Sequence, residues 1–274
     1  MLKDMRFAFI GSGAMAEAMI KGLTSKADVP GDRITASGPR PERGDELQTR
    51  YGVRTTTDNM AAIDGADIVV LSVKPQVLLG VLEQLAGRIA PDALVLSIVA
   101  GARIEPIVQT LQHEAVARSM PNTPAQIGLG MTVWTCGPQL SEAHRAHAQA
   151  VFQSCGEEVF VGDERYLDMA TALSGTGPAY VFLFMEAMVD AGVHLGFSRR
   201  VAEQMVYQTV RGSVEYARQA GRHLATLRNQ VTSPGGTSAE ALYQIEKGGL
   251  RTVMSRAIWA AYQKSRRLGK GVEE

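Results

Sequence analysis

Cysteine is scarce in this sequence: its 274 residues include only Cys136 and Cys155. Two thiols are too few for a disulfide framework or for a metal cage built from cysteine alone. A low cysteine content also favours a reducing compartment, so we expect a cytoplasmic protein that does not depend on cross-links. We predict no metal site.

The sequence also lacks an excess of charge, with 28 Lys and Arg against 28 Asp and Glu. Binding to nucleic acid or to an anionic membrane needs a surplus of basic side chains that displaces counterions from phosphates. No uninterrupted apolar run approaches the roughly 18 residues that span a bilayer, and the start of the chain lacks the pattern of a secretory signal. We therefore expect a globular protein with neither a nucleic-acid nor a membrane partner.

Residues 1–162 alternate short β-rich runs with helical stretches. The runs FAFI, IVVLSV and LVLSIV are continuously apolar, which is typical of parallel strands that helices cover on both faces. Repeated strand–helix–strand units predict an α/β fold, a Rossmann-like doubly wound parallel sheet. The predicted strands are 6–10, 33–37, 68–73, 94–99 and 115–119.

Residues 163–274 lack strand signals and predict an all-helical second domain. The helix predicted at 178–195 is apolar nearly all round, interrupted only by Glu186, Asp190 and His194. Such a helix is buried on most of its sides. A central core helix is the simpler interpretation, and cover from a dimer partner is the alternative. The predicted helices are 164–173, 178–195, 198–220, 224–230, 238–247 and 250–268.

A glycine-rich loop follows the first predicted strand and opens a helix, with the sequence Gly11-Ser12-Gly13-Ala14-Met15-Ala16. This is the G-x-G-x-x-A form of a dinucleotide-binding loop. Gly11 permits a tight turn, Gly13 lets the backbone approach a pyrophosphate, and Ala16 keeps the helix close to the strand. The helix start offers free N–H groups to the phosphates. The alternative is a glycine-rich turn in another α/β fold.

The tip of the second predicted strand indicates which dinucleotide binds. NAD-preferring sites carry Asp or Glu there to hold the ribose 2′-hydroxyl, whereas this tip reads Ala-Ser37-Gly-Pro-Arg40 and has no acid. Ser37, Arg40 and Arg43 are candidates to contact a 2′-phosphate, to which guanidinium pairs well. We predict a preference for NADPH, with NADH possible. The alternative is an exposed loop with a solvated arginine.

Ser72-Val73-Lys74-Pro75 follows the third apolar run. Ligands of such sheets bind at the carboxyl ends of the strands, so these residues are expected to line the cofactor. Lys74 is also a candidate general acid, although a solvated loop lysine is the simpler interpretation.

Three more segments complete a pattern that runs in order along the chain: RSMPNTPA at 118–125, LSGTGPAY at 173–180 and VTSPGGTS at 231–238. Together with the glycine loop and Val73-Lys74-Pro75, they make the chain resemble the pyrroline-5-carboxylate reductase family over essentially its full length. That family reduces 1-pyrroline-5-carboxylate to proline with NAD(P)H, the last step of proline biosynthesis. The resemblance implies a dinucleotide-binding domain at 1–162 and a helical domain for substrate binding and dimerisation at 163–274. It also implies a homodimer through the helical domain, often assembled into a decamer.

The resemblance also implies which residues form the site. Thr237 and Ser238 would carry catalysis. The departure from the family is Gly-Gly-Thr-Ser, where Gly-Gly-Thr-Thr or Gly-Gly-Ala-Thr is common, so the hydroxyl of Ser238 remains but a methyl group is lost. The cofactor would contact Gly11, Ser12, Gly13, Ala14, Met15, Ser37, Arg40, Asn59, Ser72, Val73, Lys74, Pro75, Ala100 and Asn122. The substrate would contact Asn122, Thr123, Ser174, Gly175, Thr176, Gly177, Ser233, Gly235, Gly236, Thr237 and Ser238.

The segment 234–240, PGGTSAE, predicts a turn that enters a helix. Thr237 as N-cap with Glu240 at N3 would form a capping box. The amides of Gly236, Thr237 and Ser238 could then hold a substrate carboxylate without an arginine. A capped helix with no ligand is the alternative for this segment alone.

No His–Asp or Lys–Glu pairing accompanies a glycine-rich segment. A protonated cyclic imine is already electrophilic and needs less acid catalysis than a ketone, so we expect Thr237 or Ser238 to assist protonation of the ring nitrogen. Two other functions stay open: another imine or β-hydroxyacid-type NADPH reductase of the same architecture, and a non-catalytic NADPH-sensing protein. The intact SGTGPAY and SPGG segments argue against the sensor.

Overall fold

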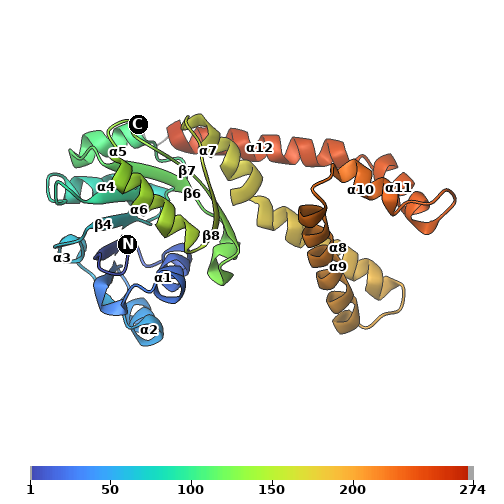
Figure 1. The fold of residues 1–274 in the computed structure, drawn as a ribbon, viewed down its shortest axis with the longest axis horizontal. Coiled ribbons are helices and arrows are strands. Elements are labelled where there is room, and N and C mark those ends of the chain that lie inside the picture. Colours follow the sequence, from blue (N-terminus) through green and yellow to red (C-terminus); the bar gives the residue numbers. More distant parts are fainter. Residues whose placement is uncertain (1, 271–274) are drawn as a thin grey trace. The chain divides into compact units, whose positions relative to one another are not determined.

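The computed structural model describes residues 2–270 and contains one eight-stranded sheet and helices that flank or follow it (Figure 1). The strands are β1 (Phe7–Ile10), β2 (Ile34–Ser37), β3 (Arg54–Thr56), β4 (Ile68–Leu71), β5 (Leu94–Ser97), β6 (Val116–Met120), β7 (Gly130–Cys136) and β8 (Gly156–Phe160). The helices are α1 (Ala14–Lys26), α2 (Pro41–Tyr51), α3 (Asn59–Ile63), α4 (Pro75–Leu85), α5 (Ile104–Leu111), α6 (Glu142–Gln153), α7 (Arg165–Ala170), α8 (Gly177–His194), α9 (Arg199–Ala220), α10 (Leu224–Gln230), α11 (Thr237–Lys247) and α12 (Leu250–Lys270).

The strands lie in the order β3-β2-β1-β4-β5-β6-β7-β8. Neighbours from β3 to β6 are parallel, β7 runs antiparallel to β6, and β8 is parallel to β7. From β1 the chain adds β2 and β3 on one side of the sheet and then returns to add β4 to β6 on the other side. Open sheets of this type bind ligands at the carboxyl ends of the strands where the order reverses, which here is next to β1. The predicted doubly wound fold is confirmed.

Alternate residues of β1 enter two hydrophobic cores, one on each face of the sheet. Phe7 and Phe9 pack with side chains of α1, α2 and α6. Ala8 and Ile10 pack with side chains of α3, α4 and α5. Burial on both faces explains the continuously apolar strands of the sequence.

The described chain divides into two compact units, residues 2–177 with 261–270, and residues 178–260. The composition change predicted a boundary at 162, whereas the packing boundary falls at 177, inside a continuous helix over Arg165–His194. The difference arises because Leu167 and Ala170 of α7 are buried in the first unit, and because α12 returns to it. There, the Oγ of Ser265 donates a 2.8 Å hydrogen bond to the carboxylate of Asp168.

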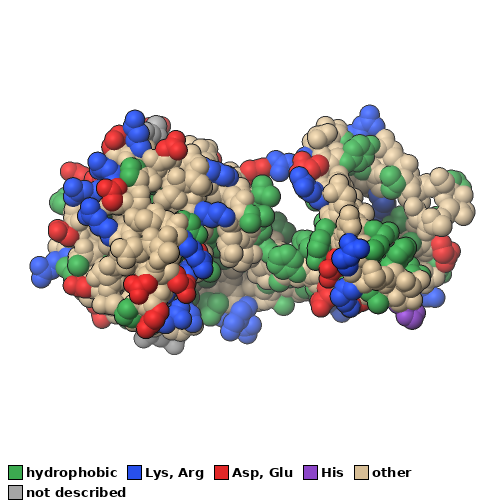
Figure 2. Space-filling model, turned by 90° about the horizontal axis from the view of Figure 1, so that it is seen from below, with side chains coloured by type: hydrophobic (Ala, Val, Ile, Leu, Met, Phe, Trp, Pro, Cys, Tyr) green, Lys and Arg blue, Asp and Glu red, His purple; other side chains and the backbone are tan. Residues whose placement is uncertain are grey.

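The second unit exposes much of its apolar surface. Of the residues of α8, only Val189 is buried, and Phe182 and Leu183 are 60% and 67% exposed. The interpretation of this segment as a central core helix of one chain was therefore wrong. Figure 2 shows hydrophobic side chains gathered over this helical part, whereas charged side chains dominate the other.

By length and composition, the helix Arg165–His194 is the one described helix that could cross a membrane, with a mean hydropathy of 1.2 in its most apolar window. The sequence analysis did not expect a segment that meets this test. Only 11% of that window is buried within the chain. The helix therefore has an apolar surface that a single copy of the chain leaves uncovered.

Candidate functional site

Gly11 joins the ends of three neighbouring strands. Its amide donates to the carbonyl of Ser37 on β2 (3.0 Å), and the Oγ of Ser72, just after β4, donates to the carbonyl of Gly11 (2.8 Å). Gly11 has φ +107°, and a Cβ there would lie 2.6 Å from the carbonyl oxygen of Ser72. Only glycine meets both requirements, so the predicted tight turn at this position has a direct structural cause.

Gly13 is the N-cap of α1, and a Cβ placed on it would meet nothing within 4 Å. The amides of Ala14, Met15 and Ala16 have no acceptor among residues 2–270. Unpaired amides at a helix start, beside a backbone without a side chain, are what a pyrophosphate requires. The open backbone of this loop therefore fits a dinucleotide.

A pocket of about 120 Å³ lies beside this loop, at the carboxyl ends of β2 and β3. Ser12 of the loop and Arg40, the exposed N-cap of α2, both line it. No carboxylate stands at the tip of β2, and Asp45 of α2 is the acidic member of the lining. Thr55, Thr56 and Thr57 on and after β3 also line the pocket. The sequence analysis missed these threonines because a three-residue strand has too little periodicity to detect.

Ser37, at the end of β2, is not among the residues that line this pocket. Its side chain is fully buried, and its Oγ donates a 2.7 Å hydrogen bond to the Oδ1 of Asn59. The Nδ2 of Asn59 in turn donates to the Oε1 of Gln84 (2.9 Å). Ser37 therefore orients Asn59, and its contact with the cofactor stays a prediction.

Arg43 is also engaged within the protein. Its Nε donates to the carbonyl of Ser12 (3.0 Å), and its guanidinium pairs with Glu17 of α1 and with Glu46. Burial raises the pKa of Glu17, but hydrogen bonds from Arg43, Tyr51 and Arg50 outweigh it and hold the pKa below its usual range. Arg43 therefore supports the glycine loop, and its contact with a 2′-phosphate stays a prediction.

The other residues predicted to contact the cofactor lie on the same carboxyl edge. Val73 is half-buried, and Lys74 is exposed as the N-cap of α4, with Pro75 at the first helical position. Ala100 is half-buried in the loop between β5 and α5. A Cβ on the neighbouring Gly101 would lie 3.0 Å from the backbone nitrogen of Gly269, so the end of α12 packs closely against this loop.

Asn122 ties two loops together. Its Oδ1 accepts from the amide of Met131 (2.9 Å), and its Nδ2 donates to the carbonyl of Ser174 (3.1 Å). The next residue, Thr123, is exposed and begins a short 3₁₀ turn. The amide group of Asn122 is thus already bonded at both ends, and it fixes the position of the 174–177 segment.

The SGTG segment, residues 174–177, begins at the end of a π-helical turn, Thr171–Gly175, that joins α7 to α8. The amide and the Oγ1 of Thr176 both donate to the carbonyl of Thr171 (2.8 Å each), and the Oγ of Ser174 donates to the carbonyl of Ala170 (3.0 Å). Single π-helical turns occur frequently at functional sites. The sequence analysis identified the segment but had no signal for this geometry.

The segment Ser233–Ser238 lies in the second compact unit and begins α11. Its N-cap is Gly236, not Thr237, and Glu240 is bonded to Gln244 instead of reaching back, so the predicted capping box is wrong. Gly235 turns the chain with φ +70°, and the amide of Gly236 donates to the carbonyl of Ser233 (3.0 Å). These glycines shift the helix start by one residue.

The shift leaves two amides for an anion instead of three. Within the described chain, the N–H groups of Thr237 and Ser238 have no acceptor, whereas that of Gly236 does. Thr237 is exposed and Ser238 is half-buried, with both hydroxyls on the same turn as the amides. A carboxylate and a neighbouring ring nitrogen could both be bonded here.

Other reactive groups give no competing site. Burial raises the pKa of the Cys136 and Cys155 thiols, which keeps them protonated. Among the described residues, no group of His, Cys, Asp and Glu side chains could hold a metal ion.

Two protein families match the sequence. The family described as pyrroline-5-carboxylate reductase dimerisation matches residues 164–268, and the family described as NADP oxidoreductase, coenzyme F420-dependent, matches residues 6–101. The first match starts close to the boundary that the change in composition indicates. The two matches separate a dinucleotide-binding part from a dimerisation part.

Full-length relatives and solved structures agree. The chain is 39% identical to a pyrroline-5-carboxylate reductase of Synechocystis, over 97% of this chain and 99% of that protein, and 38% identical to one of Pseudomonas aeruginosa, over 97% of each. A Plasmodium falciparum pyrroline carboxylate reductase with NADP bound has a TM-score of 0.90 at 29% identity, covering 98% of this chain and 100% of that one. A Coxiella burnetii pyrroline-5-carboxylate reductase has a TM-score of 0.87 at 33% identity, covering 96% and 98%.

Proposed function

The chain belongs to the pyrroline-5-carboxylate reductase family, and from that premise we propose that it reduces 1-pyrroline-5-carboxylate to proline by hydride transfer from NADPH. This reaction is the last step of proline biosynthesis, and we place it in the cytoplasm.

NADPH supplies the hydride, and the protein has to bind and orient the cofactor and the substrate and to polarise the C=N bond of the substrate. The first turn of α1 offers the amides of Ala14 and Met15 to the pyrophosphate, and Gly13 leaves room for it. Arg40, at the pocket beside the tip of β2, supplies a guanidinium for the 2′-phosphate. Exposure of this guanidinium, without a carboxylate at the strand tip, supports NADPH over NADH.

The observation that carries the proposed chemistry is the start of α11. Two amides without acceptors and two hydroxyls occur there within Thr237 and Ser238. A helix start favours a carboxylate, and the hydroxyls suit a ring nitrogen that becomes protonated during reduction. We assign substrate binding to Ser233, Gly235, Gly236, Thr237 and Ser238, with proton assistance from Thr237 or Ser238.

In the first compact unit, we assign substrate contacts to the segment 174–177 and to Thr123, which follows Asn122. Asn122 fixes the carbonyl of Ser174, and the hydroxyls of Ser174 and Thr176 are bonded to their own helix backbone. Their role is therefore to shape the backbone of the π-helical turn. We assign further substrate contacts to backbone groups of Gly175 and Gly177. A Cβ on Gly177 would meet nothing within 4 Å, whereas one on Gly175 would lie 2.8 Å from the Cε of Met120.

The helical domain, residues 163–274, is proposed to form a homodimer. The match to a dimerisation family covers 164–268, and α8 exposes large apolar side chains such as Phe182 and Leu183. A second copy that covers them accounts for the apolar helix Arg165–His194 without a membrane. Further assembly of dimers into a decamer is a separate proposal, which light scattering after gel filtration tests directly.

The decisive experiment follows NADPH absorbance with synthetic 1-pyrroline-5-carboxylate. We expect turnover, production of proline, and loss of turnover in the double variant Thr237→Ala/Ser238→Ala with NADPH affinity unchanged. Tight NADPH binding without turnover would instead support a sensor, and turnover only with another imine or a 3-oxo acid would support a different reductase. Wild-type turnover in the double variant would exclude the proposed role of the hydroxyls.

A further inference from the structure

Arginines stand at the starts of three neighbouring strands. Arg6 comes directly before β1, Arg33 directly before β2, and Arg54 begins β3. The strands are parallel and adjacent in the order β3-β2-β1, with Phe7 paired to Ile34. All three arginines therefore lie at the amino edge of the sheet, the edge opposite to the glycine loop.

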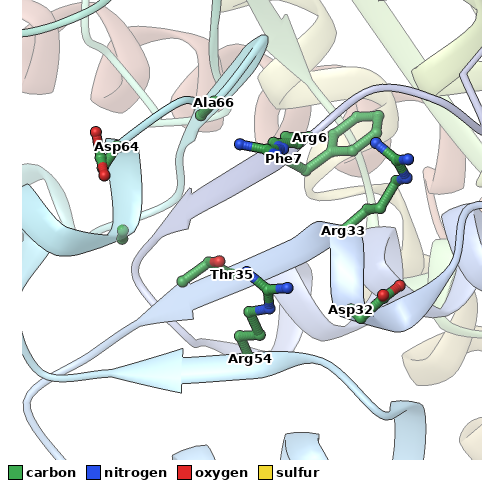
Figure 3. A pocket seen from close by; sticks show the side chains of 9 residues that line it. Arg6, Phe7, Asp32, Arg33, Thr35, Arg54, Asp64 and Ala66 are labelled. Atoms are coloured by element: carbon green, nitrogen blue, oxygen red, sulfur yellow. The ribbon is translucent and has the colours of Figure 1, made fainter.

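These arginines line one pocket of about 200 Å³, which we call the amino-edge pocket (Figure 3). Thr35 of β2 adds a hydroxyl, and the side chains of Phe7, Ala62 and Ala66 are buried apolar parts of the lining. In Figure 3, Asp32 and Asp64 lie on opposite sides of the view, at the periphery of the group. Within the first compact unit, the pocket thus combines three arginine side chains with a small apolar floor.

None of the three guanidinium groups forms an ion pair among residues 2–270, although the carboxylates of Asp32 and Asp64 belong to the same lining. Arg33 donates from Nη1 to the carbonyl of Asp4 (2.8 Å), which fixes its position but does not cancel its charge. The guanidinium groups of Arg6 and Arg54 have neither an ion pair nor a hydrogen bond among residues 2–270. Asp32 and Asp64 likewise form no ion pair in that part of the chain.

Local geometry also keeps Arg6 at the pocket. Gly65 has φ +65°, and a Cβ on it would lie 3.0 Å from the Nη1 of Arg6. A glycine at this turn therefore lets the guanidinium lie close to the backbone, and a side chain there would push it aside.

Three like charges from adjacent strands repel one another, and the repulsion is relieved when an anion binds among them. The chain has as many acidic as basic residues, so its composition does not force arginines to remain unpaired. Guanidinium groups present forked N–H donors that match tetrahedral oxyanions with two bonds each. The hydroxyl of Thr35 provides a further donor.

We propose that the amino-edge pocket binds the phosphate group of a small phosphorylated metabolite, independently of the dinucleotide site. The pocket volume admits a phosphate with a short apolar stem but not a dinucleotide. This inference does not rest on the proposed reductase activity.

The test uses the full-length protein saturated with NADPH, so that the dinucleotide site is filled. Titration with inorganic pyrophosphate in a calorimeter at low salt should show one binding site per chain. Arg54→Gln should weaken that binding at least tenfold, because it removes a guanidinium that has no other partner in residues 2–270. Arg88→Gln, at an exposed arginine outside the pocket, is the matched control and should leave the affinity unchanged.

Three results would overturn the proposal: absence of binding, binding that Arg54→Gln does not weaken, or binding that occurs only when a parallel titration leaves NADPH out. The last would place the anion in the dinucleotide site. Arg6→Gln provides a second measurement of the same contact, and its effect should match that of Arg54→Gln. Melting temperatures equal to wild type show that the variants are folded.

Discussion

The Nε of Arg43 on α2 donates a 3.0 Å hydrogen bond to the carbonyl of Ser12 in the glycine loop. Glu17 of α1 accepts from the same guanidinium and also from Arg50 and Tyr51. Because Glu17 lies on the helix that the loop opens, one arginine connects loop, α1 and α2. Arg43 and Glu17 thus hold the glycine loop in place relative to α1 and α2.

Arg43→Ala should weaken NADPH binding about tenfold while leaving the protein folded. A hydrogen bond from a charged donor contributes about 1.5 kcal/mol, which corresponds to roughly tenfold in affinity. Fluorescence titration with NADPH measures the effect. Arg50→Ala is the matched control, since Arg50 also contacts Glu17 but not Ser12. Equal losses in the two variants would show that Glu17, and not the loop carbonyl, matters.

The hydrogen bonds of Arg43, Tyr51 and Arg50 to Glu17 make the free energy of unfolding depend on pH. The pKa of Glu17 lies below its ordinary value of 4.5 in the folded protein, because hydrogen bonds from Arg43, Tyr51 and Arg50 exceed the opposing effect of burial. A lowered folded-state pKa adds stability above the unfolded pKa, and that stability is lost as the pH falls below about 4.5. Glu17→Gln should therefore be less stable than wild type at pH 7, with the gap closing towards pH 3. Urea unfolding at several pH values tests this, and a gap independent of pH would contradict it.

Arg40→Ala should reduce the preference for NADPH by at least tenfold and leave NADH kinetics nearly unchanged. The guanidinium is exposed at the pocket beside the tip of β2, so its removal affects the ligand and not the fold. The ratio of kcat/KM for the two cofactors is the measurement. The interpretation fails if the wild type uses NADH equally well, or if the variant retains its preference.

Much of the fold followed from the sequence because burial leaves a strong signal. The strands β1, β4 and β5 are covered on both faces, so their runs are continuously apolar, and the helices of the second half are long and bounded by Gly, Ser or Pro. The short strand β3 was missed because three residues carry no period. The exposure of α8 was misjudged because a sequence shows that a helix is apolar but not what covers it.

The site was predictable where the backbone itself provides the chemistry. Gly11 and Gly13 stand where a tight turn and an open helix start require glycine. Side-chain roles were less accessible, because they depend on partners distant in the sequence. Ser37 is bonded to Asn59, and Arg43 to Ser12. The number of residues between the two partners of each hydrogen bond follows no regular spacing, so a sequence pattern does not indicate the pair.

Gly11→Ala and Gly13→Ala should fail for different reasons. At Gly11 a Cβ would lie 2.6 Å from the carbonyl of Ser72, at φ +107°, so the variant should lose about 3 kcal/mol of stability from strain and overlap. At Gly13 the same Cβ meets nothing within 4 Å, so the change in stability should stay within about 1 kcal/mol. The Cβ added at Gly13 would occupy the space through which a pyrophosphate approaches, so NADPH affinity should fall sharply. Denaturant unfolding measures the stability of each variant, and NADPH titration measures its cofactor affinity. Equal unfolding midpoints for the two variants would contradict the expected difference in stability.

The last prediction concerns Arg118. Its side chain is 4% exposed, and two carboxylates balance its charge. Its Nη1 donates to Glu164 (2.9 Å), and its Nη2 lies 3.8 Å from Asp168, which also accepts from Ser265 of α12. The same Oε1 of Glu164 accepts from the amide of Ile104 (2.9 Å).

Glu164→Ala leaves a buried guanidinium with only the longer contact to Asp168, and it removes an acceptor at the start of α5. Breaking a buried pair costs about 3 kcal/mol, so the unfolding midpoint should drop clearly. Arg165→Ala is the control, because it removes the partner of an exposed ion pair with Asp163. This variant should leave the unfolding midpoint unchanged, since an exposed pair contributes little to the free energy of unfolding. Similar losses in both variants would show that the effect comes from α7 as a helix and not from the charge of Arg118. Restoration by Glu164→Gln should be partial, since an amide oxygen accepts the same bonds without neutralising the guanidinium.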